Sequence, residues 1–365
     1  MNAEKRGMKM LIAGGGTGGH VFPAIAVAEE LIRRGDDNEV LFVGTGRGLE
    51  ARVIPKAGYR LQTIDVAGLM GKGFMGVLTG LKKIPGSIIR SRAVIREFKP
   101  DVVMGVGGYV SGPVVITAHF MGIRTAVAEQ NAVPGMTNNI LGRFADRIFV
   151  SFEETSEWFP VRRVLYTGNP VRSGFARPAG KKKPDDGVFT LLIFGGSQGA
   201  SSINRSVIAA LPYLEDLKES LVIIHQAGMN DRDEVEEAYL RRGLNAKVVD
   251  FIDDMPAVYE EADLLICRAG ATSIAEITAM GKASLLIPYP YATGNHQVLN
   301  ARALVKKGAA EMLEEKDCTG ESLAMHIRDM YRDPTRRQSM EVASKDMGNP
   351  DAAGVIVDHC FDLLQ

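Results

Sequence analysis

The chain has 365 residues, enough for two domains, and its 45% apolar and 24% charged residues are the mix of a globular protein. This composition excludes a disordered, collagenous or coiled-coil protein, and no uncharged apolar run reaches the roughly 18–20 residues of a membrane-spanning helix. The net charge of −1 hides a basic half, because residues 1–170 hold 21 Lys and Arg against 15 Asp and Glu, whereas the remainder holds 22 against 29.

Short apolar runs alternate with helical patterns along the whole chain, which predicts parallel β-strands joined by α-helices. The first run leads into a glycine-rich turn and then a helical pattern that ends near Gly35. Later runs follow the same plan. We predict strands at residues 8–14, 39–44, 101–108, 125–130 and 147–151, and a second series at 189–196, 220–228, 246–252, 262–270, 282–290 and 309–313.

The two series of strands open alike, because residues 11–28 and 192–210 each fit a strand, a glycine loop and a helix. Pro, Gly and charged residues gather at 169–187, which indicates a joint between two units. We therefore predict an α/β protein of two Rossmann-like, doubly wound domains, residues 1–170 and 171–345, that face each other across a cleft. Ligands of such sheets lie at the carboxyl ends of the strands.

Gly14, Gly16 and Gly19 match the G-x-G-x-x-G pattern between a predicted strand and a helix. A nicotinamide dinucleotide site usually adds an acidic residue at the end of the second strand, but residues 43–48 contain none, which disfavours that ligand. His20 opens the following helix, where backbone N–H groups favour anions. The pattern favours a phosphate or diphosphate site at which His20 transfers a proton, and a capping histidine is the simpler alternative.

Two further glycine loops follow other predicted strands. Residues 105–113 (GVGGYVSGP) end a strand of the first series, and residues 195–200 (GGSQGA) open the second series. Ser197 either caps the next helix or binds a phosphate together with the loop amides. None of the three loops is a Walker A sequence, so we expect no ATP-type loop but two phosphorylated ligands that meet between the domains.

Polar pairs follow the later strands of the second series. Thr272 and Glu276 are four residues apart, and Gln297 and Asn300 are three apart, so each pair shares one helix face. A glutamate near a helix N-terminus is favoured by the helix dipole alone, and amides often face solvent. The functional interpretation is that Glu276 accepts hydrogen bonds from the ribose of a nucleotide and that the amides bind sugar hydroxyls.

Taken together, these segments resemble the MurG family of bacterial glycosyltransferases, which add N-acetylglucosamine to lipid I and so make lipid II in peptidoglycan synthesis. The resemblance implies the glycosyltransferase type B fold, in which the C-terminal helix, here within 346–365, returns to the N-terminal domain. The matching segments span nearly the whole chain in the family's order: GGGTGGH (14–20), GVGGYVSGP (105–113), EQNAVPG (129–135), GNPVR (168–172), GGSQGA (195–200), FIDDM (251–255), CRAGATSIAEI (267–277) and HQVLNA (296–301).

The resemblance also assigns roles to the domains. It implies that residues 1–170 bind the acceptor and the membrane and that residues 171–345 bind UDP-N-acetylglucosamine, with Glu276 on the ribose and the backbone of Ile252 on the uracil. Donor contacts are implied at Thr17, Gly18, Gly19, Asn131, Arg172, Ser197, Ile252, Ala271, Thr272, Ser273, Ile274, Ala275, Glu276, Gln297 and Asn300. Acceptor contacts are implied at Gly16, Gly107, Gly108, Tyr109 and Asn138, beside His20 and Glu129.

The implied reaction is inverting, because the acceptor 4-hydroxyl attacks the anomeric carbon opposite UDP. It needs a base for the hydroxyl, for which His20 and Glu129 are both candidates, and stabilisation of the leaving diphosphate. Loop amides, Ser197 and a helix N-terminus can supply that stabilisation without a metal ion. Asp231 and Asp233 match the metal-binding pattern of other glycosyltransferases, but they begin a helical run in which acids stabilise the first turn. We expect no metal and no cofactor.

The stretch from Val66 to Arg96 carries six basic residues and no acidic one, interleaved with apolar side chains. Such a stretch is typical of a peripheral contact with an anionic membrane surface, and a solvated basic helix face is the alternative. Nucleic acid is disfavoured because only one aromatic residue lies among the charges. Membrane contact is expected at Lys72, Phe74, Leu78, Lys82, Lys83 and Arg90.

The expected location is the cytoplasmic face of the bacterial inner membrane. Three widely spaced cysteines, which form no disulfide framework, indicate a reducing compartment. The alternatives to a transferase are a UDP-N-acetylglucosamine epimerase of the same fold and a regulator that binds nucleotide sugars. The basic apolar stretch argues against the epimerase, and His20 with Glu129 argues against the regulator.

Overall fold

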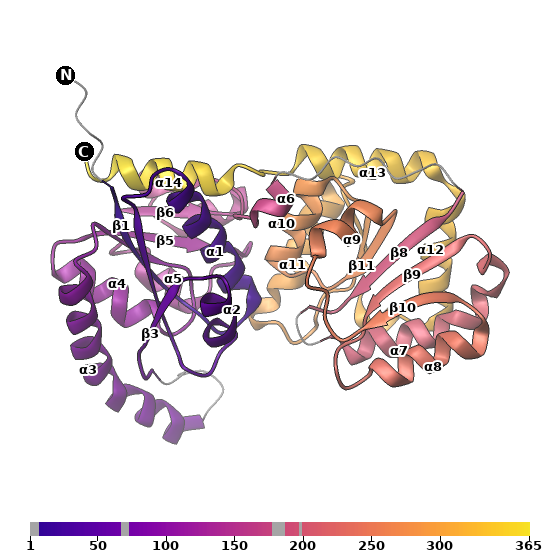
Figure 1. Cartoon of the computed structure of the whole chain (residues 1–365), viewed down its shortest axis with the longest axis horizontal. Coiled ribbons are helices and arrows are strands. Elements are labelled where there is room, and N and C mark those ends of the chain that lie inside the picture. The colour runs from indigo at the N-terminus through magenta and orange to yellow at the C-terminus, as the bar shows by residue number, and fades with distance from the viewer. Residues whose placement is uncertain (1–6, 67–72, 177–186, 197–198) are drawn as a thin grey trace. The chain divides into compact units, whose positions relative to one another are not determined.

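The computed structural model describes residues 7–66, 73–176, 187–196 and 199–365, with the backbone alone for 73–84. The chain divides into two compact units (Figure 1). Unit 1 is Met1–Ser173 together with Asp351–Gln365, and unit 2 is Gly174–Pro350. Each unit is built on one parallel sheet with helices on both faces, so the predicted fold class of two doubly wound α/β domains is confirmed.

Seven parallel strands form the sheet of unit 1, in the order β3-β2-β1-β4-β5-β6-β7. Side chains alternate between the two faces of a strand. Met10 and Ile12 of β1 pack in one apolar cluster, and Leu11 and Ala13 pack in another on the opposite face, so the strand is apolar throughout. The strands are β1 Lys9–Ala13, β2 Glu39–Gly44, β3 Arg60–Thr63, β4 Val102–Gly105, β5 Arg124–Glu129, β6 Arg147–Val150 and β7 Val164–Tyr166.

The C-terminal helix α14 (Ala352–Asp362) packs against α1 (Gly18–Arg33) in unit 1. Ile356, Val357 and Cys360 are buried with the residues beneath α1, and Arg34 donates to the Gly354 carbonyl at 2.8 Å and pairs with Asp358. The last residues of the chain therefore complete the core of unit 1. Its other helices are α2 Glu50–Lys56, α3 Gly73–Phe98, α4 Ser111–Phe120 and α5 Met136–Leu141, with 3-10 turns at Glu153–Trp158 and Val161–Arg163.

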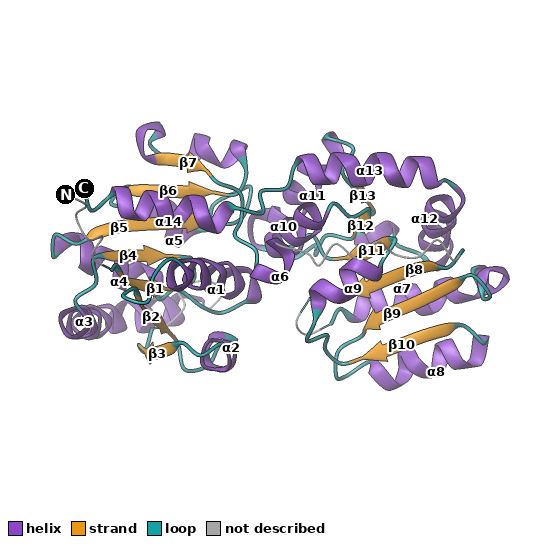
Figure 2. Cartoon of the chain, turned by 45° about the horizontal axis from the view of Figure 1, so that its top comes forward, coloured by secondary structure: helices purple, strands orange, loops and turns teal. Residues whose placement is uncertain are grey.

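Six parallel strands form the sheet of unit 2, in the order β10-β9-β8-β11-β12-β13 (Figure 2). They are β8 Phe189–Phe194, β9 Leu221–Gln226, β10 Asn245–Val249, β11 Leu264–Cys267, β12 Ser284–Leu286 and β13 Glu311–Met312. The helices are α6 Ser173–Ala176, α7 Ser201–Ala210, α8 Arg232–Arg242, α9 Met255–Glu261, α10 Ala271–Met280, α11 His296–Lys306, α12 Gly320–Arg332 and α13 Pro334–Asp346, with 3-10 turns at Leu211–Tyr213, Glu215–Leu217, Thr293–Asn295 and Glu315–Asp317.

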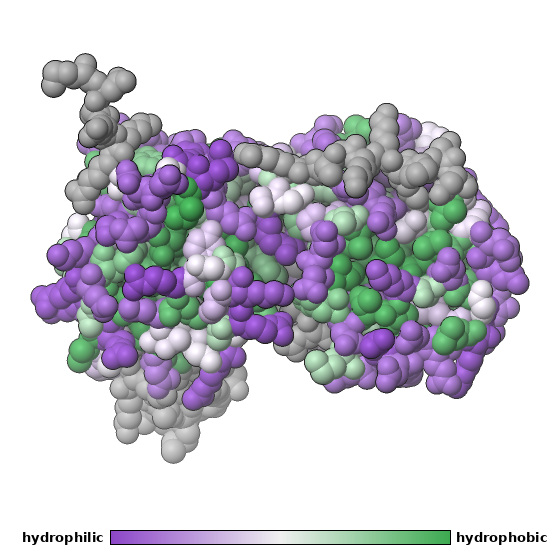
Figure 3. Space-filling view, viewed as in Figure 1, coloured by the Kyte–Doolittle hydropathy of each residue, from purple (hydrophilic) through white to green (hydrophobic). Residues whose placement is uncertain are grey.

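One face of unit 2 has an apolar area where helices cover the sheet only in part. In Figure 3, apolar side chains gather on the face of unit 2 over the region of β8, β9 and β11, and hydrophilic side chains border them at the right and below. The helix on that side, α9, has only seven residues, so it covers part of the sheet.

Every strand that the sequence predicts is present, although most are shorter than the apolar runs that indicated them. Most of the residues by which the predicted strands at 101–108 and 262–270 exceed β4 and β11 lie in the turns that follow these two strands. Two strands, β3 and β7, were not predicted. Both lie at sheet edges and have half-buried or exposed residues, so they lack the apolar runs that mark central strands.

Candidate active site at the carboxyl ends of the strands

The first two glycine loops of unit 1 leave neighbouring strands, because β1 and β4 pair side by side. Helix α1 after β1 packs on one face of the sheet, and α4 after β4 packs on the other. This is a topological switch point, where the loops diverge and leave room for a ligand. The helices α1 and α4 begin directly after loops 14–17 and 106–110.

The two loops approach each other so closely that glycine is required. A Cβ added at Gly14 would lie 2.2 Å from the Val106 side chain, and one added at Gly108 would lie 2.8 Å from the Gly15 carbonyl oxygen. Gly107 and Gly108 also have positive φ angles of 101° and 78°. The predicted acceptor residues of these loops are thus brought together, and Tyr109 beside them is 41% exposed.

His20, in the first turn of α1, lies between the two loops. Its Nδ1 is 3.2 Å from the Gly15 carbonyl oxygen, and a Cβ added at Gly107 would lie 2.8 Å from its Nε2. A carbonyl oxygen only accepts hydrogen bonds, so Nδ1 carries the ring proton and Nε2 is the nitrogen that can accept another. The ring is half-buried, whereas Gly16 and Thr17 are exposed. Gly18 and Gly19 form the first turn of α1 with it.

Glu129 ends β5 and is 2% exposed. Its Oε1 accepts from the backbone and side-chain N–H of Asn131 at 3.0 and 3.2 Å, and its Oε2 accepts from the Gly135 N–H at 3.1 Å and the Asn138 side chain at 2.9 Å. Asn138 also donates to the Ala128 carbonyl at 3.0 Å. The carboxylate therefore organises the turn before α5, and His20 is the better placed of the two base candidates.

Two residues that support the first loops were not singled out from the sequence. The Ser111 hydroxyl accepts from the Gly107 N–H at 3.1 Å and lies 2.7 Å from the carbonyl oxygens of Ala13 and Gly107. Glu50 accepts from the Gly16 N–H at 2.8 Å. The sequence did contain a signal for Glu50. It lies two residues beyond the stretch 43–48, which was inspected for the ribose-binding acid of a dinucleotide site.

Arg172 lies at the end of unit 1, where its guanidinium stacks 4.6 Å from the centre of the Phe22 ring of α1. Such stacking fixes the guanidinium while its edge can still donate hydrogen bonds. Neighbouring Asn169 is 6% exposed, and neither polar atom of its side chain has a hydrogen-bond partner among the described residues. Buried amides are normally paired, so Asn169 is a further residue that the sequence reasoning missed and a candidate for a polar contact.

Unit 2 repeats the arrangement, because β8 and β11 are neighbours at its own switch point. The third glycine loop follows β8, and Gly196 and Gly199 have φ angles of 100° and 77°. A Cβ added at Gly199 would lie 2.2 Å from the Ala227 carbonyl oxygen, so this loop also depends on glycine. Ser197 lies outside the described residues.

A buried polar network supports this third loop. His225 is fully buried, and its ring contacts the Tyr239 hydroxyl at 2.9 Å and the Asn204 side-chain oxygen at 3.0 Å. The Asn204 amide donates to the Ala227 carbonyl at 2.9 Å and to Asp231 at 2.8 Å. Burial lowers the pKa of His225 to about 3, so the ring is neutral. Asp231, one of the two acids considered for a metal, is thereby a partner in this network.

The remaining predicted donor residues, all in unit 2, lie on α10 and α11 and before α9. Glu276 is 5% exposed, whereas Thr272, Ser273 and Ala275 are half-buried, and Ala271 and Ile274 are buried. The buried side chain of Ile252 leaves its backbone as the part that can contact a ligand. Gln297 accepts from the Tyr289 N–H at 2.9 Å, and the fully buried Asn300 donates to the Ala269 carbonyl at 3.2 Å. Asn300 therefore braces the turn before α10.

Arg268 is a further polar residue of this region that the sequence reasoning missed. It follows β11 and is 8% exposed. Its guanidinium donates to the Ser202 hydroxyl at 2.7 Å, pairs with Glu315 at 2.5 Å and lies 5.4 Å from the Tyr289 ring centre. Arg268 thus connects the start of α7 with the turn before α10. These two segments follow β8 and β11, the neighbouring strands of the switch point in unit 2.

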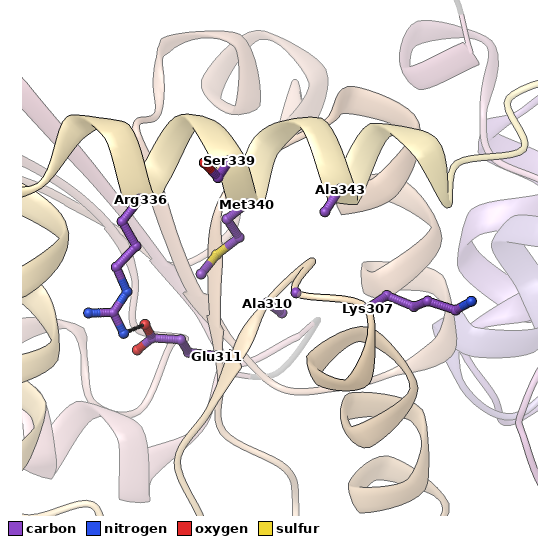
Figure 4. Close-up of a pocket in the computed structure, with 8 residues that line it drawn as sticks. Lys307, Ala310, Glu311, Arg336, Ser339, Met340 and Ala343 are labelled. Atoms are coloured by element: carbon purple, nitrogen blue, oxygen red, sulfur yellow. Dashed lines mark hydrogen bonds and ion pairs between the residues drawn. The ribbon is translucent and has the colours of Figure 1, made fainter.

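Figure 4 shows a pocket of about 580 Å³ elsewhere in unit 2, between α13 and the edge strand β13. Arg336 turns toward Glu311 and pairs with it, and His326 contacts the same carboxylate at 2.7 Å. Burial acts to raise the pKa of Glu311, but the bonds to His326 and Arg336 hold it below its ordinary value. No predicted site residue lines this pocket, so we place the chemistry at the switch points.

Two structural findings concern metal binding and the predicted membrane contact. Among the described residues, no three His, Cys, Asp or Glu side chains gather as metal ligands, and no helix there has the length and apolarity to cross a membrane. Arg90 is exposed on α3 beside Ile89, which is 71% exposed. Lys72 lies outside the described residues, as do the side chains of Phe74, Leu78, Lys82 and Lys83.

Comparison with known proteins identifies the family. Models of the glycosyltransferase family 28 N-terminal and C-terminal domains match residues 10–150 and 190–356. A relative from Syntrophus aciditrophicus, named UDP-N-acetylglucosamine--N-acetylmuramyl-(pentapeptide) pyrophosphoryl-undecaprenol N-acetylglucosamine transferase, is 52% identical over 98% of this chain and 99% of its own length. The chain belongs to glycosyltransferase family 28.

Solved structures place the chain more narrowly within family 28. The crystal structure of MurG from Acinetobacter baumannii is 32% identical, covers 96% of this chain and 98% of that one, and gives a TM-score of 0.76. The resemblance to the MurG family is thus confirmed. A UDP-GlcNAc 2-epimerase from Neisseria meningitidis also shares the fold, with a TM-score of 0.65 over 96% of this chain and 99% of that one, but it is only 14% identical.

Proposed function

We propose that this chain is a hexosyltransferase that moves N-acetylglucosamine from UDP-N-acetylglucosamine to the 4-hydroxyl of lipid I, the undecaprenyl-diphospho-N-acetylmuramoyl pentapeptide. The products are lipid II, for peptidoglycan synthesis, and UDP. The observation that carries the proposal is the 52% identity, over 98% of the chain, to a relative named for this transfer. The placement of His20 between two glycine loops supports it.

In the proposed reaction, His20 Nε2 takes the proton of the acceptor 4-hydroxyl. The hydroxyl oxygen bonds to the anomeric carbon as the bond from that carbon to the UDP oxygen breaks, and inversion results. Three features support His20 as the base: the Nδ1–H tautomer, the partial exposure of the ring and its position beside Gly107. Glu129 takes a positioning role, because both of its oxygens already accept from the turn at 131–138.

The donor nucleotide binds unit 2 in this proposal. Glu276 accepts from the ribose hydroxyls, the backbone of Ile252 contacts uracil, and Gln297 lies on the next helix. The loop at 195–200 with the N-terminus of α7 stabilises the leaving diphosphate, because its amides and the helix dipole favour negative charge. Thr17, Gly18, Gly19, Asn131 and Arg172 of unit 1 complete the donor contacts, and Gly16, Gly107, Gly108, Tyr109 and Asn138 belong to the acceptor side.

The membrane contact is proposed on α3, where exposed Ile89 and Arg90 continue the basic apolar stretch of 66–96. Cationic side chains near anionic lipid contribute about 1 kcal/mol each, so several together hold a peripheral enzyme near a lipid-linked acceptor. The location that follows is the cytoplasmic face of the inner membrane.

The decisive test is transfer of label from UDP-N-acetylglucosamine to a lipid-I-like acceptor with a short, soluble chain. We expect a labelled disaccharide product linked β1→4, and loss of that product in His20→Gln. An epimerase would instead change the free UDP-sugar with no acceptor present. That outcome, or the absence of any labelled acceptor, would overturn the proposed function.

A further inference from the structure

Glu50, the first residue of α2, is a charged side chain with no exposed surface. Its Oε1 accepts from the Thr45 N–H at 3.0 Å and from the Thr45 hydroxyl at 2.6 Å, and its Oε2 accepts from the Gly16 N–H at 2.8 Å. Burial acts to raise the pKa of Glu50, but these hydrogen bonds outweigh it and hold the pKa below its ordinary value. Glu50 is therefore a carboxylate at neutral pH.

Glycines on two loops form the space that holds this carboxylate. A Cβ added at Gly15 would lie 2.6 Å from Glu50 Oε1, and one added at Gly48 would lie 2.0 Å from its Oε2. The Leu49 N–H also donates to the Gly16 carbonyl at 3.3 Å. The loop after β2 thus holds the first glycine loop by both the N–H and the carbonyl of Gly16.

One peptide group connects Glu50 with His20. The Gly15 carbonyl and the Gly16 N–H belong to the same planar unit, so they point in opposite directions and move together. Its N–H donates to Glu50, and its carbonyl accepts from His20 Nδ1 at 3.2 Å. A charged acceptor at one end of a hydrogen-bonded peptide also polarises the other end, which strengthens the second bond.

We propose that Glu50 is a positioning residue for the transfer, which acts through the Gly15–Gly16 peptide to hold His20 in its Nδ1–H tautomer. Which imidazole nitrogen can accept a proton is set by the bond that the other nitrogen makes. Here the buried carboxylate fixes the carbonyl that Nδ1 must bond, and Nε2 is left as the base. The inference rests on the proposed function, in which His20 accepts the proton of the hydroxyl.

Glu50→Gln tests this arrangement, because glutamine has one acceptor oxygen. The Thr45 N–H and hydroxyl both donate to that oxygen, so the glutamine N–H₂ group faces the Gly16 N–H. Two donors then meet, and the Gly15–Gly16 peptide loses its acceptor. We expect kcat with the soluble acceptor to fall about 10- to 100-fold, a part of the roughly 10²- to 10⁴-fold that a general base contributes. The Kd for UDP should change less than about twofold, because Glu276 and Ile252, the proposed contacts of ribose and uracil, lie on unit 2. Wild-type kcat in Glu50→Gln would overturn the proposal.

Asp146→Asn is the matched control. Asp146 accepts from the N–H and hydroxyl of Thr125 at 2.8 and 3.1 Å, as Glu50 does from Thr45, and it lies in the same unit but before β6 at the amino ends of the strands. We expect this variant to lower the thermal stability and to keep kcat within about twofold of wild type. Equal losses of kcat in the two variants would show a merely structural role for Glu50.

The tautomer itself is measured by nitrogen NMR at pH 8 on protein labelled at its six histidines, with His20→Gln to identify the His20 signals. We expect the Nδ1–H form in the wild type and a mixture of tautomers in Glu50→Gln. The Nε2–H form in the wild type would overturn the proposal even if Glu50→Gln failed to fold. This readout needs no turnover, so it stays distinct from a failure of the proposed transfer.

Discussion

Buried polar residues at the carboxyl ends of the strands are of two kinds. Glu50, Glu129 and Asn300 bond the backbone of the loops beside them. Glu276 is also buried, and it lies in the first turns of α10, where we propose a contact with the ribose. Partly exposed His20 combines both roles, because its Nδ1 bonds the carbonyl of Gly15 in the loop and its Nε2 is the proposed base. Substitution of a residue that holds a loop should therefore impair turnover, whereas substitution of a residue that contacts the nucleotide should impair binding.

Glu276→Ala should weaken UDP binding. Removal of a charged acceptor from two ribose hydroxyls costs about 1.5–3 kcal/mol, which corresponds to about a 10-fold or larger rise in Kd. Calorimetric titration with UDP measures it. Glu234→Ala, at an exposed glutamate of α8 in the same unit, should leave the Kd unchanged. A wild-type Kd in Glu276→Ala would remove this residue from the nucleotide site.

His225 should make the stability of unit 2 depend on pH. Its pKa is about 3 in the folded protein against an ordinary 6.5, so below pH 6.5 the unfolded chain binds a proton that the folded chain excludes. Stability is therefore lost as the pH falls from about 6.5 toward 3, with a limiting slope of about 1.4 kcal/mol per pH unit. Scanning calorimetry between pH 7 and 5 should show a shallower decline for His225→Gln.

His119→Gln serves as the comparison, because His119 is an exposed residue at the end of α4. It should keep the wild-type dependence of stability on pH. If the stability of His225→Gln and that of the wild type fell with the same slope as the pH is lowered, the inference that the buried ring is neutral would be wrong.

At the scale of elements, the placement of the strands and of the glycine loops was predictable, and the hydrogen-bond partners were not. The central strands stand out because both faces are apolar, whereas edge strands β3 and β7 have no such run. The glycine loops and His20 follow from local spacing. Glu50 is bonded to a residue 34 positions earlier, and Asn300 to one 31 positions earlier, so only the fold brings these partners together. Spacing put Gln297 and Asn300 on one helix face without showing that Asn300 is fully buried.

Helix α3 should attach the enzyme to anionic membranes. Replacement of Lys82, Lys83 and Arg90 by Glu should weaken binding to anionic vesicles far more than to neutral ones, because attraction becomes repulsion. High salt should act in the same direction, since the screening length falls to about 3 Å at 1 M. Vesicle co-sedimentation measures both effects.

The control for α3 is charge reversal of Arg241 and Arg242, which are exposed on α8 of unit 2. This variant should bind anionic vesicles nearly as the wild type does. Turnover of a short-chain soluble acceptor should survive the α3 substitutions. A collapse of that turnover with unchanged vesicle binding would move α3 from the membrane to the active site.

At the scale of the whole molecule, one plan occurs twice. Each unit has a parallel sheet, a switch point between two central strands and a glycine loop ahead of a helix. In the proposed reaction these loops, rather than an ion, meet the diphosphates of the two substrates. The plan was visible in the sequence because residues 11–28 and 192–210 follow the same pattern.

Transfer should therefore persist when divalent cations are removed. Backbone amides and helix dipoles keep their charge distribution in the presence of EDTA, so the initial rate with a soluble acceptor should match the untreated rate. The rate is compared before and after chelation, and again with added Mg²⁺. Loss of transfer with EDTA and recovery with Mg²⁺ would contradict stabilisation by the loops alone.

The packing of α14 on α1 bears on how the protein is made. Residues 174–350 leave the ribosome before α14 does, so unit 2 can fold while the apolar surface beneath α1 still lacks Ile356, Val357 and Cys360. Unit 1 begins synthesis first and is completed last. A nascent chain that has released residues 174–350 but not α14 can thus contain a folded unit 2 together with a unit 1 whose core is unfinished.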